Sequence, residues 1–431
     1  MDDTTTATAT TYDAGRKTKP VILPLRAQKV ASLPLPRQPN KLLFHHNVSL
    51  TVSLAVGAPP QNVSMVLDTG SELSWLLCNT SSSPNSFNLL ASSSYRPLPC
   101  SSPACQSQAR DLPVPPSCDP SSNACRVSLS YADASSSEGS LAADSFLLGR
   151  PPPLRTVFGC IFSSYDSSAA AAATHGLLGM NRGALSFVTQ SATRRFSYCI
   201  SDRDDSGVLL LGGDAGSAPF APRLNYTPLI EISLPLPYFD RVAYSVQLEG
   251  IRVGAALLPI PKSVLAPDHT GAGQTMVDSG TQFTFLLGDA YDALKVEFLR
   301  QTRALLTPLN EPDFVFQGAF DLCFRIPAAG AGAGAPLPSR LPEVGVVLRG
   351  AELRVSGERL LYRVEGERRG GDGVWCATFG NSDLVPMSAY VIGHHHQQNL
   401  WVEYDLDNRR VGFAPVRCDL AAQRLTEALS L

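Results

Sequence analysis

Apolar and polar positions alternate over many short segments of the chain, with the period of two that is typical of β-strands. In VSLTVSLAV (48–56), apolar or β-branched residues alternate with Ser and Thr. The next residues, GAPP (57–60), predict a turn, and VSMVL (63–67) predicts a returning strand. Further strands are predicted at 126–133, 207–213, 243–254 and 400–415, the last being a hairpin that turns at Asp407-Asn408. We therefore expect a mostly-β protein.

One segment has helical spacing instead. In DAYDALKVEFLRQTRALL (289–306), apolar residues at positions 294, 298 and 305 predict one buried face, and Asp289 is a candidate N-cap. Residues 1–40 have no sustained period, so a disordered or pro-segment-like leader is expected there. Two low-complexity stretches, 167–174 and 328–336, predict surface loops.

The length of the chain predicts two lobes, because 431 residues exceed what one hydrophobic core ordinarily organises. We expect an N-terminal lobe at 41–222, a C-terminal lobe at 223–420 and a tail at 421–431. Hydrophobic residues make up 44% and charged residues 17%, which is a globular balance. A net charge of −3 without a block of Lys or Arg argues against nucleic acid as a partner. No apolar run approaches the length of a membrane span.

The ten cysteines are even in number and lack the spacing of a four-ligand zinc site. Disulfides are therefore expected, and with them an oxidising compartment of the secretory pathway: the endoplasmic reticulum, the vacuole or the cell exterior. Seven cysteines precede the middle of the chain and three follow it, so full pairing requires at least one bridge between the halves. Four sequons are glycosylation candidates, at Asn47, Asn62, Asn79 and Asn225. No apolar signal-peptide segment is visible in the first 40 residues.

An internal repeat is the most informative feature of the sequence. Residues 68–76 read DTGSELSWL and residues 278–286 read DSGTQFTFL, with matching residue classes at each position. Each copy follows an apolar strand. A second element also recurs downstream, as Gly-Leu-Leu-Gly (176–179) and as Tyr-Val-Ile-Gly (390–393). Two homologous lobes related by a pseudo-twofold axis would produce this pattern.

The repeat places one carboxylate at the tip of an apolar strand in each lobe, Asp68 and Asp278. If the two strands met at the lobe interface, the carboxylates could not both ionise and would share one proton. One carboxylate would then accept a proton from water, while its partner donates one to a peptide carbonyl oxygen. The neighbouring residues are expected to support this pair through hydrogen bonds and close backbone approach: Thr69, Gly70, Ser71, Ser279, Gly280 and Thr281.

These motifs resemble those of the pepsin-type aspartic proteases, over residues 44 to 418. The Cys-rich segment 78–125, the phrase FSYC (196–199) and the run IGHHHQQNLWVEYDLDNRRVGFAP are similar to the plant nepenthesin-like branch. The resemblance implies an all-β bilobal fold: two related β-barrel-like lobes, an active-site cleft between them and a few short helices. It also implies a monomeric aspartic endopeptidase that cleaves protein or peptide substrates at acidic pH without a cofactor. Asp68 and Asp278 would be its catalytic pair.

The same resemblance assigns further residues. Tyr131 would be the flap tyrosine that closes over the substrate, with Trp75 as its neighbour. Ala132 and Ala134 stand where the family's flap usually has glycines. The implied disulfides are Cys199–Cys418 between the lobes and Cys323–Cys376 within the second lobe. The remaining cysteines are unassigned: Cys78, Cys100, Cys105, Cys118, Cys125 and Cys160.

Two alternatives belong to other functional classes. A non-enzymatic binding protein on this fold, similar to the plant xylanase inhibitors, would typically have lost part of the catalytic pattern, whereas both Asp loops are intact here. A metal-dependent hydrolase could use His394–His396, but three consecutive residues do not all point one way and no carboxylate or cysteine lies at ligand spacing. No metal site is therefore expected. The sequence has no Gly-x-Ser-x-Gly, phosphate-loop or His-Glu-x-x-His motif.

Overall fold

The computed structural model describes most of the chain. The described residues are 20–29, 48–80, 84–133, 135–149, 152–165, 174–203, 205–213, 224–327, 337–338 and 340–430. The predicted surface loops at 167–174 and 328–336, except Thr174, lie outside them, as do Asn47, Ala134 and most of the predicted leader.

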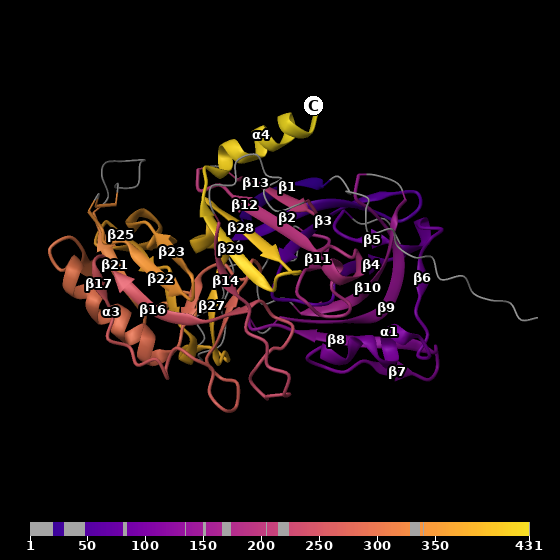
Figure 1. The fold of residues 1–431 in the computed structure, drawn as a ribbon, viewed down its shortest axis with the longest axis horizontal. Helices are drawn as coiled ribbons and strands as arrows, with labels where there is room; N and C mark the ends of the chain where they lie inside the picture. Colours follow the sequence, from indigo (N-terminus) through magenta and orange to yellow (C-terminus); the bar gives the residue numbers. More distant parts are fainter. Residues whose placement is uncertain are drawn as a thin grey trace, which may run out of the picture.

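Strands of the N-terminal half form the body of one lobe, drawn in indigo to magenta in Figure 1. The burial pattern of the first ones follows their sequence alternation, and the predicted turn at 57–60 joins the first two, with Gly57 at φ 94°. These strands are β2 (Val48–Val56), β3 (Gln61–Asp68), β4 (Trp75–Asn79), β5 (Phe87–Asn88), β6 (Arg96–Pro97), β7 (Ser117–Asp119), β8 (Ala124–Ser130), β9 (Ser136–Leu147), β10 (Leu154–Tyr165), β11 (Gly176–Gly179), β12 (Arg195–Ile200) and β13 (Ser206–Leu211).

The C-terminal half contributes its strands to several smaller sheets. Among the described residues these sheets have the orders β15-β18-β27-β19-β26, β17-β16-β22-β23 and β20-β21-β25-β24. The strands are β14 (Asn225–Pro228), β15 (Ser245–Val246), β16 (Leu248–Val253), β17 (Ala256–Leu257), β18 (Gln274–Val277), β19 (Thr284–Leu286), β20 (Thr307–Pro308), β21 (Cys323–Ile326), β22 (Val344–Leu348), β23 (Ala351–Val355), β24 (Leu361–Arg369), β25 (Asp372–Ala377), β26 (Phe379–Asn381), β27 (Ala389–Ile392), β28 (Leu400–Asp405) and β29 (Arg410–Pro415).

One sheet joins the two lobes. The predicted hairpin 400–415 is present as β28 and β29, and β28 pairs antiparallel with β12 of the N-terminal lobe. The order along this sheet runs β14-β29-β28-β12-β13-β1-β2-β3 within the described residues. In Figure 1, the yellow strands β28 and β29 lie between the two halves of the molecule. The two lobes are therefore joined by one continuous hydrogen-bonded sheet.

Residues 21–29 differ from the prediction of an irregular leader. They form β1 (Val21–Lys29), which pairs with β2 on one side and with β13 on the other. Leu25 is buried in this position. The β1 sequence VILPLRAQK lacks a clean alternation, so its place in the sheet depends on the two neighbouring strands and not on its own pattern.

The long predicted helix is α3 (Gly288–Thr302). Leu294 and Phe298 are buried as predicted, but Leu305 lies beyond the helix and is 39% exposed. The N-cap prediction is also wrong, because Leu287 occupies the cap and Asp289 lies in the first turn, where its charge favours the helix dipole.

The other helices are short, apart from the last. They are α1 (Pro103–Gln106), α2 (Phe187–Gln190), η1 (Leu89–Ala91), η2 (Gln108–Asp111), η4 (Gly357–Arg359), η5 (Ser382–Leu384), η6 (His394–Gln397) and α4 (Cys418–Ser430). The predicted tail therefore begins as α4, whose Ala421 and Leu425 pack with Cys199 and Trp401 against the shared sheet. No described helix has the length and apolar character required to cross a membrane.

Candidate active site

The repeated sequence elements give two equivalent strand arrangements. In the N-terminal lobe, β11 lies parallel to β3 and antiparallel to β4, and Gly179 pairs with Asp68. In the C-terminal lobe, β27 lies parallel to β18 and antiparallel to β19, and the Asp278 N–H donates to Ile392 O at 3.1 Å. Both aspartates therefore stand where a buried strand ends and a tight loop begins.

Each aspartate accepts the same pair of hydrogen bonds from its own loop. The Gly70 N–H donates to Asp68 Oδ1 at 2.8 Å, and Ser71 Oγ donates to Asp68 Oδ2. The Gly280 N–H donates to Asp278 Oδ1 at 2.8 Å. Thr281 Oγ1 donates to Asp278 Oδ2 at 2.6 Å. The geometry is symmetric, as expected if the two loops are copies of one ancestral motif.

The two loops are locked to each other through their hydroxyl residues. The Ser279 N–H donates to Thr69 Oγ1 at 2.9 Å, and the Thr69 N–H donates to Ser279 Oγ at 3.1 Å. Each hydroxyl also donates to a backbone carbonyl of the opposite lobe, Thr69 to Val277 O at 3.3 Å and Ser279 to Leu67 O at 2.9 Å. Both residues are almost fully buried, so these bonds are shielded from water.

The two carboxyl groups face each other across this junction. A Cβ added to Gly70 would lie 2.9 Å from Asp278 Oδ1, and one added to Gly280 would overlap Asp68 Oδ1. Only glycine leaves room for the opposing carboxylate at either position. Burial raises the pKa of Asp68 well above its ordinary value, and the adjacent Asp278 raises it further through its charge and a side-chain hydrogen bond. The protonated form of Asp68 is therefore favoured in this arrangement.

Tyr131 and Trp75 lie together beside this pair. Trp75 Nε1 donates to Tyr131 Oη at 2.6 Å. Burial and then the charge of Asp68 raise the pKa of the Tyr131 phenol, and Tyr131 lines the same cavity as Asp68 and Asp278. Tyr131 follows β8, and its N–H donates to Ser135 O at 3.0 Å across the turn to β9. Tyr131 thus lies at the turn of the hairpin formed by β8 and β9.

A cavity of about 850 Å³ contains all of these groups. Its wall includes Asp68 and Asp278, Trp75 and Tyr131, and the 235–242 segment of the C-terminal half. A volume of this size accommodates several residues of an extended peptide.

Four acidic residues of this wall were not singled out by the sequence analysis: Glu72, Asp111, Asp133 and Asp240. Glu72 is the position where the repeat changes charge, because its counterpart in the second loop is Gln282. That difference within an otherwise matching motif could have identified Glu72 from the sequence. Asp111, Asp133 and Asp240 had no such signal, since all three lie outside the repeat.

The three histidines do not form a metal site. His394 and His396 are buried in η6, and desolvation of the partly buried His395 lowers its pKa to about 4. His396 is held between Thr378 Oγ1 at 2.8 Å and Thr284 Oγ1 at 2.6 Å. Within the described part of the chain, no group of His, Cys, Asp or Glu could hold a metal ion. The histidines instead support the second Asp loop, since the His394 N–H donates to Thr281 O at 2.8 Å.

All ten cysteines are bridged in the structure. The pairs are Cys78–Cys160, Cys100–Cys118, Cys105–Cys125, Cys199–Cys418 and Cys323–Cys376. Cys199–Cys418 ties β12 to the start of α4 and so crosses between the halves. The sequon residues Asn62, Asn79 and Asn225 are exposed, so each side chain is accessible for glycosylation. Glycosylation at these positions stays a prediction.

Sequence profiles match both lobes. The profile described as Xylanase inhibitor N-terminal matches residues 50–213, and the profile described as Xylanase inhibitor C-terminal matches residues 243–415. Together the two profiles cover more than half of the chain.

Individual relatives are named as aspartic proteinases. The chain is 58% identical over 411 residues to Aspartic proteinase PCS1 of Arabidopsis thaliana, covering 94% of this chain and 89% of the relative. It is 31% identical over 378 residues to Aspartic proteinase nepenthesin-1 of Nepenthes gracilis, covering 85% of this chain and 77% of the relative.

Solved structures share the fold. The crystal structure of edgp superimposes with a TM-score of 0.67 at 20% identity, over 96% of this chain and 98% of that one. The crystal structure of Basic 7S globulin from soybean has a TM-score of 0.63 at 20% identity, over 93% of this chain and 97% of that one. The expected all-β fold is therefore confirmed.

Proposed function

Because the chain belongs to the plant branch of the pepsin-type aspartic proteinases, and is thus a peptide hydrolase, we propose that it is an endopeptidase in which Asp68 and Asp278 activate a water molecule. The observation that carries the proposal is the opposed pair of carboxylates, each braced by its own loop and adjacent to a glycine of the other.

The reaction proceeds with one proton on the pair. The ionised carboxylate takes a proton from the water as its oxygen attacks the scissile carbonyl carbon, and the protonated carboxyl donates to the carbonyl oxygen. No covalent intermediate with the enzyme forms. Ser71 and Thr281 hold the outer oxygens, so the facing oxygens are left for water and substrate.

Tyr131 acts as the flap over the bound peptide. Its hydroxyl is fixed by Trp75, so the ring closes over the cavity in one orientation and excludes water from the aspartates. We propose an acidic pH optimum, because cleavage requires the singly protonated pair. The five disulfides support a location in the secretory pathway, and the enzyme is proposed to act as a monomer on protein or peptide substrates.

The proposal is tested by cleavage of a quenched fluorescent peptide library at about pH 4–5, with and without pepstatin. Pepstatin-sensitive internal cleavage is expected, and addition of EDTA should leave the rate unchanged. Binding of peptides without cleavage would instead favour a silent binding protein on this fold. That alternative is not favoured, because both Asp loops are complete and the relatives above are named as proteinases.

A further inference from the structure

Glu72 has an unusual environment for a carboxyl group. It is only 5% exposed, although it lines the catalytic cavity. Oε1 accepts a hydrogen bond from the Leu185 N–H at 2.8 Å, but Oε2 has no hydrogen-bond partner among the described residues. Gly183 lies directly against the carboxyl, since a Cβ there would overlap it. A buried carboxyl oxygen without a partner is costly, which points to a ligand that completes its hydrogen bonding.

Two further carboxyls of the cavity wall also bond through one oxygen only, although both are more exposed than Glu72. Asp111 Oδ1 accepts a hydrogen bond from Arg241 at 2.7 Å. Asp240 Oδ1 accepts from the Val242 N–H at 2.8 Å and the Ala243 N–H at 3.2 Å. Within the part of the chain that the structure describes, no hydrogen bond involves the second oxygen of either side chain. Each of these two carboxyls therefore accepts hydrogen bonds from the protein on one oxygen only, and its other oxygen is available to a ligand.

These three carboxyls act on one another electrostatically. Burial, opposed by the hydrogen bond from the Leu185 N–H and assisted by the charges of Asp111 and Asp240, raises the pKa of Glu72 to about 7. Partial desolvation in the cavity wall raises the pKa of Asp240, while the charge of Arg182 opposes this shift and the charge of Asp111 adds to it. A bound cation would favour the ionised form of both carboxyls and would therefore lower these pKa values.

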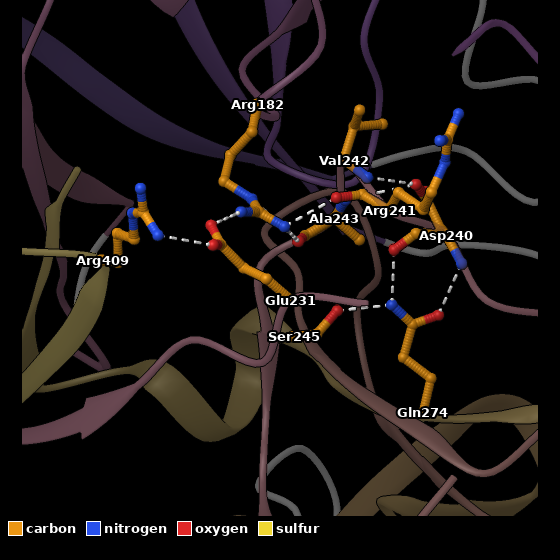
Figure 2. A network of polar contacts seen from close by, with 9 residues as sticks. All are labelled: Arg182, Glu231, Asp240, Arg241, Val242, Ala243, Ser245, Gln274 and Arg409. Carbon is orange, nitrogen blue, oxygen red and sulfur yellow. Dashed lines mark hydrogen bonds and ion pairs between the residues drawn. The ribbon is translucent and has the colours of Figure 1, made fainter. Parts of the chain in front are cut away.

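Arg182, the arginine that anchors this part of the wall, is already bonded to other groups of the protein. Arg182 binds Glu231 at 2.6 Å and donates to the carbonyl oxygens of Arg241 at 2.7 Å and Ala243 at 3.1 Å, as Figure 2 shows. Glu231 in turn binds Arg409 at 3.0 Å.

The two arginines of the cavity wall are engaged as well. Arg241 is paired with Asp111, and Arg110 donates to Ser107 O at 2.7 Å. The wall as a whole carries six carboxyl side chains and two guanidinium groups. These are Asp68, Glu72, Asp111, Asp133, Asp240 and Asp278 against Arg110 and Arg241.

Figure 2 also shows how Asp240 is positioned. Its backbone is held by Gln274, whose Oε1 accepts from the Asp240 N–H at 2.9 Å and whose Nε2 donates to Asp240 O at 2.7 Å. Arg182 anchors the following residues through the carbonyls of Arg241 and Ala243. The segment that carries Asp240 is therefore fixed against both lobes, as a preorganised binding wall requires.

We propose that Glu72, Asp111 and Asp240 form a subsite for a lysine or arginine side chain of the substrate, an inference that rests on the proposed endopeptidase function. A cationic side chain carries several N–H donors, which match the unused oxygens of these carboxyls. A neutral side chain of the same length would leave the oxygens unsatisfied, and an acidic one would be repelled.

The test compares peptides that differ at one position only. Each position of a cleaved peptide is occupied in turn by Lys, by norleucine as its uncharged counterpart and by Glu, and kcat/KM is measured for each. At one position the native enzyme is expected to favour Lys over norleucine by about tenfold or more. Glu72→Gln and Asp240→Asn should each lower that ratio by about tenfold. Asp292→Asn removes an exposed carboxylate of α3 outside the cavity and should leave the ratio unchanged.

Charge reversal provides the second arm. Asp240 is exposed, so Asp240→Lys is compatible with folding, and it should shift the preference at the same position from Lys toward Glu. A Lys-to-norleucine ratio near one at every position, or a ratio that survives both Glu72→Gln and Asp240→Asn, overturns the subsite. If no peptide is cleaved at all, the proposed endopeptidase function itself has failed, which is a distinguishable result.

Discussion

Thr69 and Ser279 exchange hydrogen bonds across the lobe boundary, each accepting on its hydroxyl oxygen from the backbone N–H of the other. Each residue directly follows one of the catalytic aspartates in sequence. The relative position of the two carboxyls therefore depends on this interlock more than on the lobes as separate bodies. It converts two independent strand ends into one rigid site.

Thr69→Val should destabilise the junction between the two Asp loops while leaving both aspartates in place. The valine keeps the shape of the side chain but leaves the Ser279 N–H buried without a partner, so the free energy of unfolding should fall by about 1–3 kcal/mol. We expect kcat to fall by about tenfold as the carboxyls lose their fixed separation. Denaturant unfolding and peptide cleavage measure the two effects. Thr275→Val is the matched control, because the buried Thr275 hydroxyl has no hydrogen-bond partner among the described residues, and its loss should be neutral.

The hydrogen bond between Trp75 and Tyr131 is predicted to orient the flap. Trp75→Phe removes the indole N–H that donates to Tyr131 Oη, so kcat/KM should fall by about tenfold while the melting temperature changes little. Trp375→Phe, on β25 outside the cavity wall, should leave kcat/KM unchanged. Equal losses in both variants would mean that the effect is not specific to the flap.

The cross-lobe disulfide is predicted to stabilise the fold more than a short local one. Cys199 and Cys418 are separated by 219 residues, whereas Cys100 and Cys118 are separated by 18. In the chain-entropy account, replacing the long-range pair by alanines should lower the free energy of unfolding by about 5 kcal/mol, against about 3 kcal/mol for the short-range pair. Denaturant titration of the two double variants measures both losses in the free energy of unfolding. A larger loss from the Cys100–Cys118 variant would contradict the entropic argument.

The site was more predictable from sequence than the fold that surrounds it. Asp68 and Asp278 are marked by a nine-residue repeat, whose local hydrogen bonds involve only the next three residues. The shared sheet is different. Pairing of β28 with β12 joins residues about 200 positions apart, and nothing in either strand's own alternation specifies that partner. Strand β1 was missed for the same reason.

The lowered pKa of His395 predicts how the free energy of unfolding depends on pH. The folded-state pKa of His395 is lowered to about 4 from 6.5, so its stabilising effect is complete above 6.5 and is lost as the pH falls toward 4. Between these values the free energy of unfolding of the native protein should fall by about 2–3 kcal/mol more than that of His395→Gln. Unfolding titrations across this pH range measure the difference. Parallel pH profiles for the two proteins would show that His395 does not titrate on unfolding.

The central claim is that Asp68 and Asp278 work as one unit, and the double-variant comparison tests it most directly. Asp68→Asn, Asp278→Asn and the double variant are assayed for peptide cleavage, with melting temperatures to verify folding. We predict that each single variant loses at least about 10³-fold in kcat and that the double variant loses hardly more. Folded single variants that keep activity within about tenfold of the native enzyme would contradict the account.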